Sequence, residues 1–255
     1  MHRIVLCALM VIALSVLTVG ESQGSIYSWT DWQTSSSTNG FTGFGTITTT
    51  STSVSVTYNN PQGIAFYQTG TGVDYFQNGP GAGGRDAADS PYTSTVVENI
   101  PTAAEMIALQ FAGTQTLTFS EAIANPVFSY VSLNSNGYAF DQDFEILSVG
   151  GVDGNDPGYW GAGTSSKQVV DLGGGNFEYR LVGTGEPHGT IRFLGSFDTL
   201  TWRSLSNEFW NGFTVGIEGT SSEVFGAVPE PASIAMWSVF GVAGLAFGLR
   251  RRMRK

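Results

Sequence analysis

Residues 47–58 read ITTTSTSVSVTY, and they carry the clearest structural signal in the chain. Val54, Val56 and Tyr58 alternate with small hydroxyl side chains, so one set of side chains would face a core and the other would face solvent. β-Branched and aromatic residues at this period favour an extended conformation. The stretch therefore predicts a half-buried β-strand over residues 47–58, and a second strand at 64–68 is expected to pair with it.

Short segments of the same kind recur along the chain, separated by turns rich in Gly and Asn, whereas long helical periodicity is missing. The expected strands are 47–58, 64–68, 106–111, 117–119, 126–133, 138–149, 177–182, 190–194, 199–202 and 212–217. No internal repeat of fixed period is present, which argues against a solenoid. The pattern predicts an all-β fold, a single antiparallel β-sandwich of jelly-roll type over residues 25–218. A polar strip at 219–228 is expected to be a flexible linker.

The first 24 residues have the features of a secretory signal peptide. A short basic start at residues 1–3 precedes an almost wholly apolar run at 4–19, and small residues follow it. The sequence leaves an uncleaved membrane anchor open as the alternative. Cys7 is the only cysteine and lies inside this segment, so the mature protein is expected to have no disulfide and no thiol chemistry.

The other end of the chain has the features of a membrane-spanning segment. Residues 232–249 are eighteen residues without a charge, long enough as a helix to span about 27 Å. A basic cluster follows directly and ends the chain: Arg250, Arg251, Arg252, Arg254 and Lys255. Such a cluster stays on the cytoplasmic side, so the body is expected outside the plasma membrane.

The ordered series of Pro229-Glu230-Pro231, the apolar span and the Arg-rich end resembles the PEP-CTERM sorting signal of Gram-negative bacteria. The same tail has also been described as an ice-binding protein C-terminal domain. The resemblance covers residues 229–255 and implies that the chain is a substrate of an exosortase-type processing enzyme. It further implies that the membrane helix anchors a precursor and that the body reaches the cell surface or the extracellular matrix. The two prolines also keep the motif extended, so that an enzyme could reach it.

Charge excludes one class of partner. The body, residues 25–228, has five cationic and nineteen acidic residues, a formal charge of −14. Such a surface repels phosphate backbones, so nucleic acid is not an expected partner.

Two short segments are candidate binding sites. Asp153, Asn155 and Asp156 form a loop dense in side-chain oxygens, the ligands that Ca²⁺ prefers, and a plain turn between strands is the alternative. Tyr159 and Trp160 lie between glycines and are the best candidates for stacking on a sugar ring, although aromatic residues also fill sandwich cores. No other cofactor is expected.

Three acidic residues and one histidine are candidates for catalysis. Asp141, Asp143 and Glu145 stand at period two and would share one face of the strand 138–149, the solvent face on the plainest interpretation. His188 is the only histidine beyond the signal segment and is expected to be exposed in a turn. Neither feature localises an acid/base pair, so the sequence favours an exported, non-catalytic surface or matrix protein. The alternatives are a polysaccharide-binding module, with or without calcium, and, ranked last, a glycan-active enzyme.

Overall fold

A computed structural model describes residues 24–81, 83–152 and 154–226 of this chain. The expected signal peptide, the Pro229-Glu230-Pro231 motif, the apolar span 232–249 and the basic end lie outside the described residues. Among the residues that are described, no helix has the length and apolarity needed to cross a membrane.

The described residues form sixteen strands and one short helix. They are β1 Ser28–Trp29, β2 Asp31–Ser36, β3 Phe41–Thr48, β4 Ser53–Asn60, β5 Phe66–Thr69, β6 Glu105–Leu109, β7 Gly113–Ala124, β8 Val127–Val131, β9 Gly137–Phe140, β10 Glu145–Val149, β11 Gly163–Gly173, β12 Asn176–Gly185, β13 Gly189–Arg192, β14 Ser196–Ser204, β15 Asn211–Ile217, β16 Gly219–Thr220 and α1 Ser221–Phe225. The prediction of an all-β fold built from antiparallel strands is confirmed.

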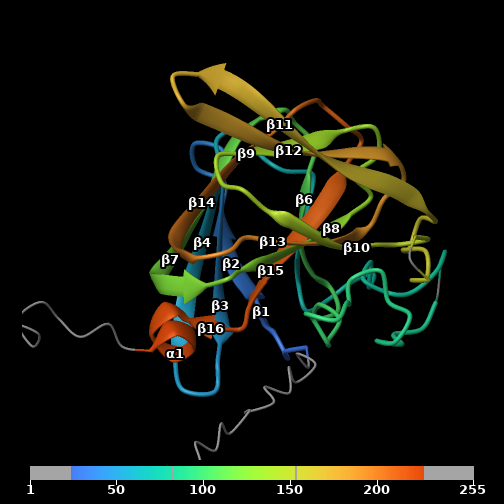
Figure 1. Ribbon diagram of the computed structural model, residues 1–255, viewed down its shortest axis with the longest axis horizontal. Helices are drawn as coiled ribbons and strands as arrows, with labels where there is room; N and C mark the ends of the chain where they lie inside the picture. Colours follow the sequence, from blue (N-terminus) through green and yellow to red (C-terminus); the bar gives the residue numbers. More distant parts are fainter. Residues whose placement is uncertain (1–23, 82, 153, 227–255) are drawn as a thin grey trace, which may run out of the picture.

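The strands make two sheets that lie face to face (Figure 1). One sheet has the order β10-β13-β8-β15-β6-β5, with β1 added beside β15, and the other has the order β11-β12-β9-β14-β7-β4-β3-β2, with β16 added beside β7. Strands β6, β8, β13 and β15 lie in the seven-stranded sheet, and β7, β9, β12 and β14 lie in the nine-stranded sheet. Successive strands thus alternate between the sheets from β6 to β9 and again from β12 to β15, and β9 pairs with β12. The chain therefore crosses repeatedly from one sheet to the other, and the core lies between them.

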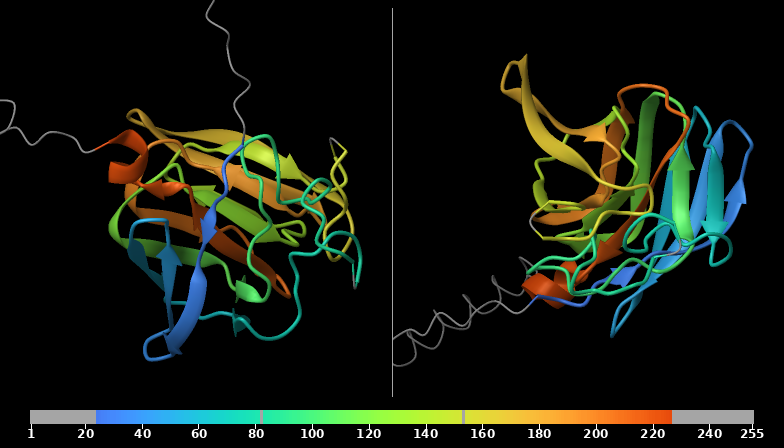
Figure 2. Two further views of the ribbon diagram at one scale, coloured as in Figure 1. Left: turned by 90° about the horizontal axis from the view of Figure 1, so that it is seen from below. Right: turned by 90° about the vertical axis from the view of Figure 1, so that its right-hand side faces the viewer.

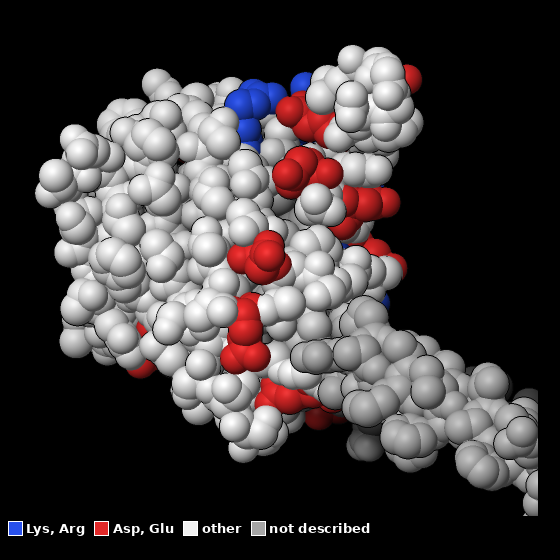
Figure 3. Space-filling view, turned by 90° about the vertical axis from the view of Figure 1, so that its left-hand side faces the viewer, with Lys and Arg blue, Asp and Glu red and all other residues white. Residues whose placement is uncertain are grey.

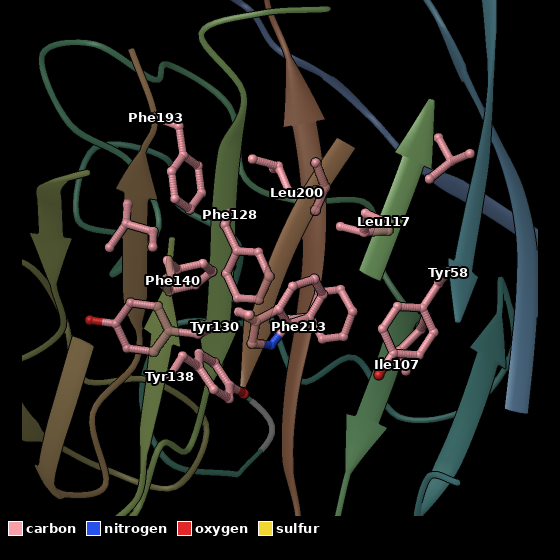
Figure 4. Packing of buried hydrophobic residues seen from close by; sticks show 14 of the residues in the cluster. Tyr58, Ile107, Leu117, Phe128, Tyr130, Tyr138, Phe140, Phe193, Leu200 and Phe213 are labelled. Carbon is pink, nitrogen blue, oxygen red and sulfur yellow. The ribbon is translucent and has the colours of Figure 1, made fainter. Parts of the chain in front are cut away.

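Aromatic side chains fill the space between the sheets (Figure 4). Phe128 of β8 stacks on Phe213 of β15 at 4.8 Å between ring centroids, and Trp202 of β14 meets both rings edge-on from the opposite sheet. Tyr58 and Phe140 extend the same cluster. Offset and edge-to-face contacts of this kind add to the stabilisation that area burial alone provides.

The seven-stranded sheet is buried on both faces. Its inner face joins the aromatic core, and residues 70–104, here called the covering segment, pack on its outer face (Figure 2). In β8, Phe128 faces inward, while Val131 contacts Phe76 and Tyr92 of the covering segment in a second cluster. A strand buried on both faces carries apolar residues in succession, and β6, β8 and β15 contain no exposed residue. Both sheets and the three apolar clusters lie within residues 24–226.

The stretch 47–58 is two strands instead of one. Residues 47–48 end β3, residues 49–52 turn, and β4 begins at Ser53. The Thr49 side chain accepts hydrogen bonds from the backbone N–H groups of Ser51 and Thr52. Such local bonds take up N–H groups that would otherwise pair with a neighbouring strand, so the chain turns here. The expected pairing with 64–68 is also wrong, because β5 pairs with β6 in the other sheet.

The predicted strand 138–149 is likewise divided. β9 lies in the nine-stranded sheet and β10 in the seven-stranded sheet, and residues 141–144 connect them. Phe140 and Phe144 are both buried in the core, so the apolar alternation continues across the bend. This explains why period two alone predicted one strand.

The segment after β15 is part of the folded body. Thr220 caps α1: its side chain accepts from the Glu223 backbone, while the Glu223 carboxylate accepts from the Thr220 N–H at 2.6 Å. Glu223 also accepts hydrogen bonds from Thr49 and Ser51, and Ser221 contacts Ser196 at the start of β14. The part of the predicted linker that is described therefore packs on the nine-stranded sheet and is not free.

Replacing Phe128 with Ala should lower the free energy of unfolding by about 3–5 kcal/mol, because the change removes a fully buried ring and leaves a cavity. Urea unfolding of residues 24–226 measures it. Val169→Ala is the matched control, since Val169 is 57% exposed on β11 and should cost less than about 0.5 kcal/mol. Equal costs for the two variants would contradict the assignment of the core.

Candidate functional site: an aromatic cleft at one end of the sandwich

Tyr159 and Trp160 lie in the connection between β10 and β11, on a tight turn closed by a bridge between Gly158 and Gly161. The Gly81 N–H donates to the Tyr159 carbonyl at 3.0 Å, and the Gly79 N–H donates to the Pro157 carbonyl. The turn is thus fixed to the covering segment on both sides of Gly158. Trp160 is 48% exposed, so the structure places a large aromatic side chain at the surface where the sequence predicted one.

Trp160 belongs to a contiguous aromatic cluster on the outside of the seven-stranded sheet. Tyr159 packs edge-on against Trp160 at 4.8 Å and against Tyr75 at 5.0 Å, and Tyr75 packs against Trp210 at 4.9 Å. Phe66 of β5 supports Trp210 from beneath at 5.0 Å. The cluster holds the rings in fixed orientations, although they come from four separate stretches of sequence.

Beside this cluster the surface is hollowed into a cleft of about 420 Å³. We call it the aromatic cleft, and its lining consists of Ser132, Asn134, Trp160, Glu186, Glu208, Phe209 and Trp210. Three of the seven are aromatic, and Phe209 is 85% exposed. The other four provide carboxylate, amide and hydroxyl groups. An aromatic wall facing a few polar groups is the usual composition of a small-molecule site.

Apart from the turn that carries Trp160, the cleft is built by three loops at the same end of the sandwich. Residues 132–136 follow β8, residues 186–188 follow β12 and residues 205–210 follow β14. The Leu133 N–H donates to the Pro187 carbonyl at 3.1 Å, which joins the first loop to the second. The Asn136 side chain accepts from the Ser206 N–H at 3.0 Å, which joins the first to the third. These bonds hold the cleft lining without help from a ligand.

The two carboxylates of the cleft lie in different environments. Glu186 accepts hydrogen bonds from Ser132 Oγ and, at 2.6 Å, from Asn134 Nδ2. Glu208 accepts from Asn211 Nδ2 at 2.8 Å. Burial, with a smaller contribution from the charge of Glu186, raises the pKa of Glu208 to about 7. A carboxyl group whose pKa is raised in this way lacks a compensating positive charge.

The sequence prediction reached only Trp160 among the lining residues. Glu186, Glu208 and Phe209 were missed because they lie far apart along the chain, and only the fold brings their loops together. One local signal was present: Phe209 and Trp210 form an apolar pair inside the otherwise polar turn 206–211. Two large aromatic residues in a turn expose apolar area unless they serve a site or the core.

The proposed calcium loop is described only in part. Asp153 lies outside the described residues. The Asn155 carbonyl accepts from the Gly151 N–H at 3.0 Å, which closes a turn, and the Asp156 N–H donates to the Asp89 carbonyl at 2.5 Å, which fixes the loop to the covering segment. Among the described residues, no group of three or more His, Cys, Asp or Glu side chains is placed to hold a metal ion. A calcium site at Asp153, Asn155 and Asp156 therefore stays a prediction.

The acidic residues at 141–145 do not share one strand face. Asp141 and Asp143 lie in the connection between β9 and β10, and only Glu145 is in a strand. Asp143 pairs with Lys167, and Glu145 pairs with Arg192 at 2.7 Å. Both of these carboxylates are neutralised by neighbouring cations. A hollow of about 330 Å³ lies here, with a single salt bridge across it, Lys167 to Asp143.

A hollow of about 570 Å³, larger than the aromatic cleft, lies elsewhere, between the covering segment and β10. Its lining is mostly small: Ala87, Ala88, Thr93, Ser94, Thr95, Val97, Glu98, Leu147 and Asn155. It has no aromatic side chain and one carboxylate. Size alone does not make a site, and the aromatic cleft carries the more specific set of chemical groups.

His188 is buried, contrary to the expectation of an exposed turn residue. It has no exposed surface, and its Nδ1 lies 3.0 Å from the Tyr92 hydroxyl. A side chain at Gly158 would collide with the imidazole, so the ring packs directly beneath the turn that carries Tyr159 and Trp160. Burial lowers the pKa of His188 to about 3, which keeps the ring neutral.

The buried His188 should make the protein less stable in acid. Between pH 6.5 and about 3 the unfolded chain binds a proton at this residue and the folded chain does not, so the free energy of unfolding falls as the pH falls. The expected slope is about 1.4 kcal/mol per pH unit. Urea unfolding of the protein and of His188→Gln, at pH 6.5, 5.5 and 4.5, isolates this slope as the difference between them.

Glu105 and Glu208, whose pKa values burial raises to about 7, act in the opposite direction, since the folded protein binds their protons more tightly. Their effect is common to both proteins and cancels in the difference. Parallel pH profiles for the two proteins would contradict a neutral, buried His188.

A scan against protein-family models found no match, and searches of curated proteins and of solved structures found none either. The interpretation of the aromatic cleft therefore depends on its own geometry and chemistry.

Proposed function

We propose that this chain is an exported protein, sorted through its C-terminal tail, and that its body binds extracellular polysaccharide at the aromatic cleft without catalysis. The observation that carries the proposal is the placement of Trp160, Phe209 and Trp210 around one cleft that also holds two carboxylates, an amide and a hydroxyl. Sugar rings have apolar faces that stack on aromatic side chains and hydroxyl groups that bind carboxylates and amides. The cleft offers both kinds of contact.

The rigidity of the cleft also favours binding. Trp160 is held between the covering segment and the aromatic cluster, and the three loops are joined by backbone hydrogen bonds. Less conformational entropy is lost when a ligand binds to groups that are already ordered. A surface protein that must hold a flexible polymer benefits from such preorganisation.

The export part of the proposal is supported by the sequence of the two ends. A signal peptide over residues 1–24 and a PEP-CTERM-like tail over 229–255 would bring the body across the plasma membrane of a Gram-negative-type bacterium. The membrane, which the C-terminal helix would span, and an exosortase-type enzyme are then its partners during sorting. The mature body reaches the cell surface or the matrix. The strand order β6-β15-β8-β13 against β7-β14-β9-β12 supports classing the body as a jelly roll.

Hydrolysis of a glycan is the second candidate function, because Glu208 has a raised pKa and Glu186 lies in the same cleft. Binding ranks first because hydrogen-bond donors already occupy both oxygens of Glu186, which weakens it as a base or nucleophile. Products released from an oligosaccharide by the protein, and lost in Glu208→Gln, would reverse this order.

Replacing Trp160 with Ala should lower affinity for the glycans that the protein binds on a glycan array by at least tenfold, because it removes the main stacking surface. Phe177→Ala is the matched control, since Phe177 is 44% exposed on the β11–β12 hairpin, outside the cleft, and should bind as the parent does. Failure of the parent to bind any extracellular polysaccharide, or equal binding by Trp160→Ala, would overturn the proposed site.

Replacing Pro229, Glu230 and Pro231 together with Ala should block processing at the tail. The variant is expected to accumulate in the membrane fraction with residues 232–255 still attached, whereas the parent is recovered without them. Intact mass of the protein from the cell envelope and from the medium measures the difference. Equal masses and an equal distribution for both would remove the sorting signal from the proposal.

A further inference from the structure

The charges around the aromatic cleft are unevenly matched. All five cations of the described residues already pair with carboxylates: Arg85 with Asp74, Lys167 with Asp143, Arg180 and Arg203 with Glu178, and Arg192 with Glu145. None of the five lines the cleft. On the face shown in Figure 3, Asp and Glu extend along the molecule while Lys and Arg are concentrated toward one end.

Glu186 and Glu208 therefore face the cleft without a positive partner among the described residues. Their hydrogen-bond donors, Ser132, Asn134 and Asn211, are neutral. Burial and, to a smaller extent, the negative charge of Glu186 both raise the pKa of Glu208, so both penalise its ionised form. A positively charged group placed between them would relieve both penalties at once.

On the basis of the proposed function, we infer that the aromatic cleft selects polysaccharides that carry free amino groups over neutral and acidic ones. An ammonium group is a compact donor of three hydrogen bonds, which suits two carboxylates that approach from different loops. The rings of Trp160 and Trp210 stand beside the carboxylates, and aromatic faces attract cations. The sugar ring can thus lie on an aromatic side chain while its amino group reaches Glu186 and Glu208.

The same charges disfavour the other glycan classes. A uronic acid or sulfated sugar would bring a negative charge to two carboxylates on a body whose formal charge is −14. A neutral sugar would bring no positive charge to Glu186 and Glu208. A divalent cation is a poorer fit than an ammonium group, because Ca²⁺ takes six to eight oxygen ligands and no group of three His, Cys, Asp or Glu side chains is gathered in the described residues.

Calorimetric titration at pH 7 and low salt tests the inference with three probes: a β-1,4-linked glucosamine tetramer, its fully N-acetylated counterpart and cellotetraose. The glucosamine tetramer should bind to residues 24–226 about tenfold more tightly than the other two, the effect expected of one additional charge-assisted contact. Addition of calcium should not raise affinity for any of the three.

Variants assign the selectivity to the carboxylates. Glu186→Gln and Glu208→Gln should each lower affinity for the glucosamine tetramer about five- to tenfold and change affinity for the N-acetylated tetramer less than about twofold. Trp160→Ala should weaken both ligands, which separates stacking from charge. Two independent carboxylate variants, each checked for an unchanged melting profile, guard against a folding defect.

The outcomes distinguish selectivity for amino sugars from polysaccharide binding in general. Equal or tighter binding of the acetylated or neutral tetramers, with Trp160 still required, would overturn the amino-sugar selectivity and leave polysaccharide binding intact. Selectivity that survives both Gln substitutions would overturn the role of the carboxylates. No binding of any glycan, here or on an array, would overturn the proposed function itself.

Discussion

The fold depends on covering both faces of the seven-stranded sheet. Its central strands, β8 and β15, contain no exposed residue, so each must be covered on both sides, by the nine-stranded sheet within the core and, for β8, by the covering segment outside. The described chain contains no cysteine, and burial therefore has to supply the stabilisation that disulfides supply in many exported domains. Phe128 and Val131 of a single strand contribute to two different apolar clusters, which shows how the layers are joined.

This requirement also accounts for the position of the aromatic cleft. The covering segment brings Tyr75 and Tyr92 over the sheet, and the turn with Trp160 rests on that segment and on the buried ring of His188. The loops after β8, β12 and β14 then close the cleft from the other side. The exposed aromatic side chains are thus a continuation of a packed interior and are not isolated surface residues.

Sequence patterning was informative where one strand face meets water. In the nine-stranded sheet, β4 and β7 alternate between buried and exposed residues; period two identified β4, whereas only residues 117–119 of β7 were predicted. It failed at Thr49–Thr52, where hydroxyl side chains close a turn, and at residues 141–144, where the chain changes sheet without breaking the apolar alternation. His188 was misjudged because the burial of a Gly- and Pro-flanked turn depends on the distant Tyr92. The sequence could not show that Glu186 and Glu208 share a cleft, because they are 22 residues apart in the chain and only the fold brings their loops together.

The contact of α1 with the start of β14 has a directional consequence. Ser221 meets Ser196 at one end of β14, and the strand runs to Ser204, from which the loop with Glu208 and Phe209 departs. Nine residues of strand span about 30 Å, so α1 and the aromatic cleft lie at opposite ends of β14. A body held from its C-terminal side would point the aromatic cleft away from its point of attachment. The covalent chain also runs from the cleft through β15 and β16 to α1, so a pull on a bound ligand would pass along β15 in the middle of the seven-stranded sheet.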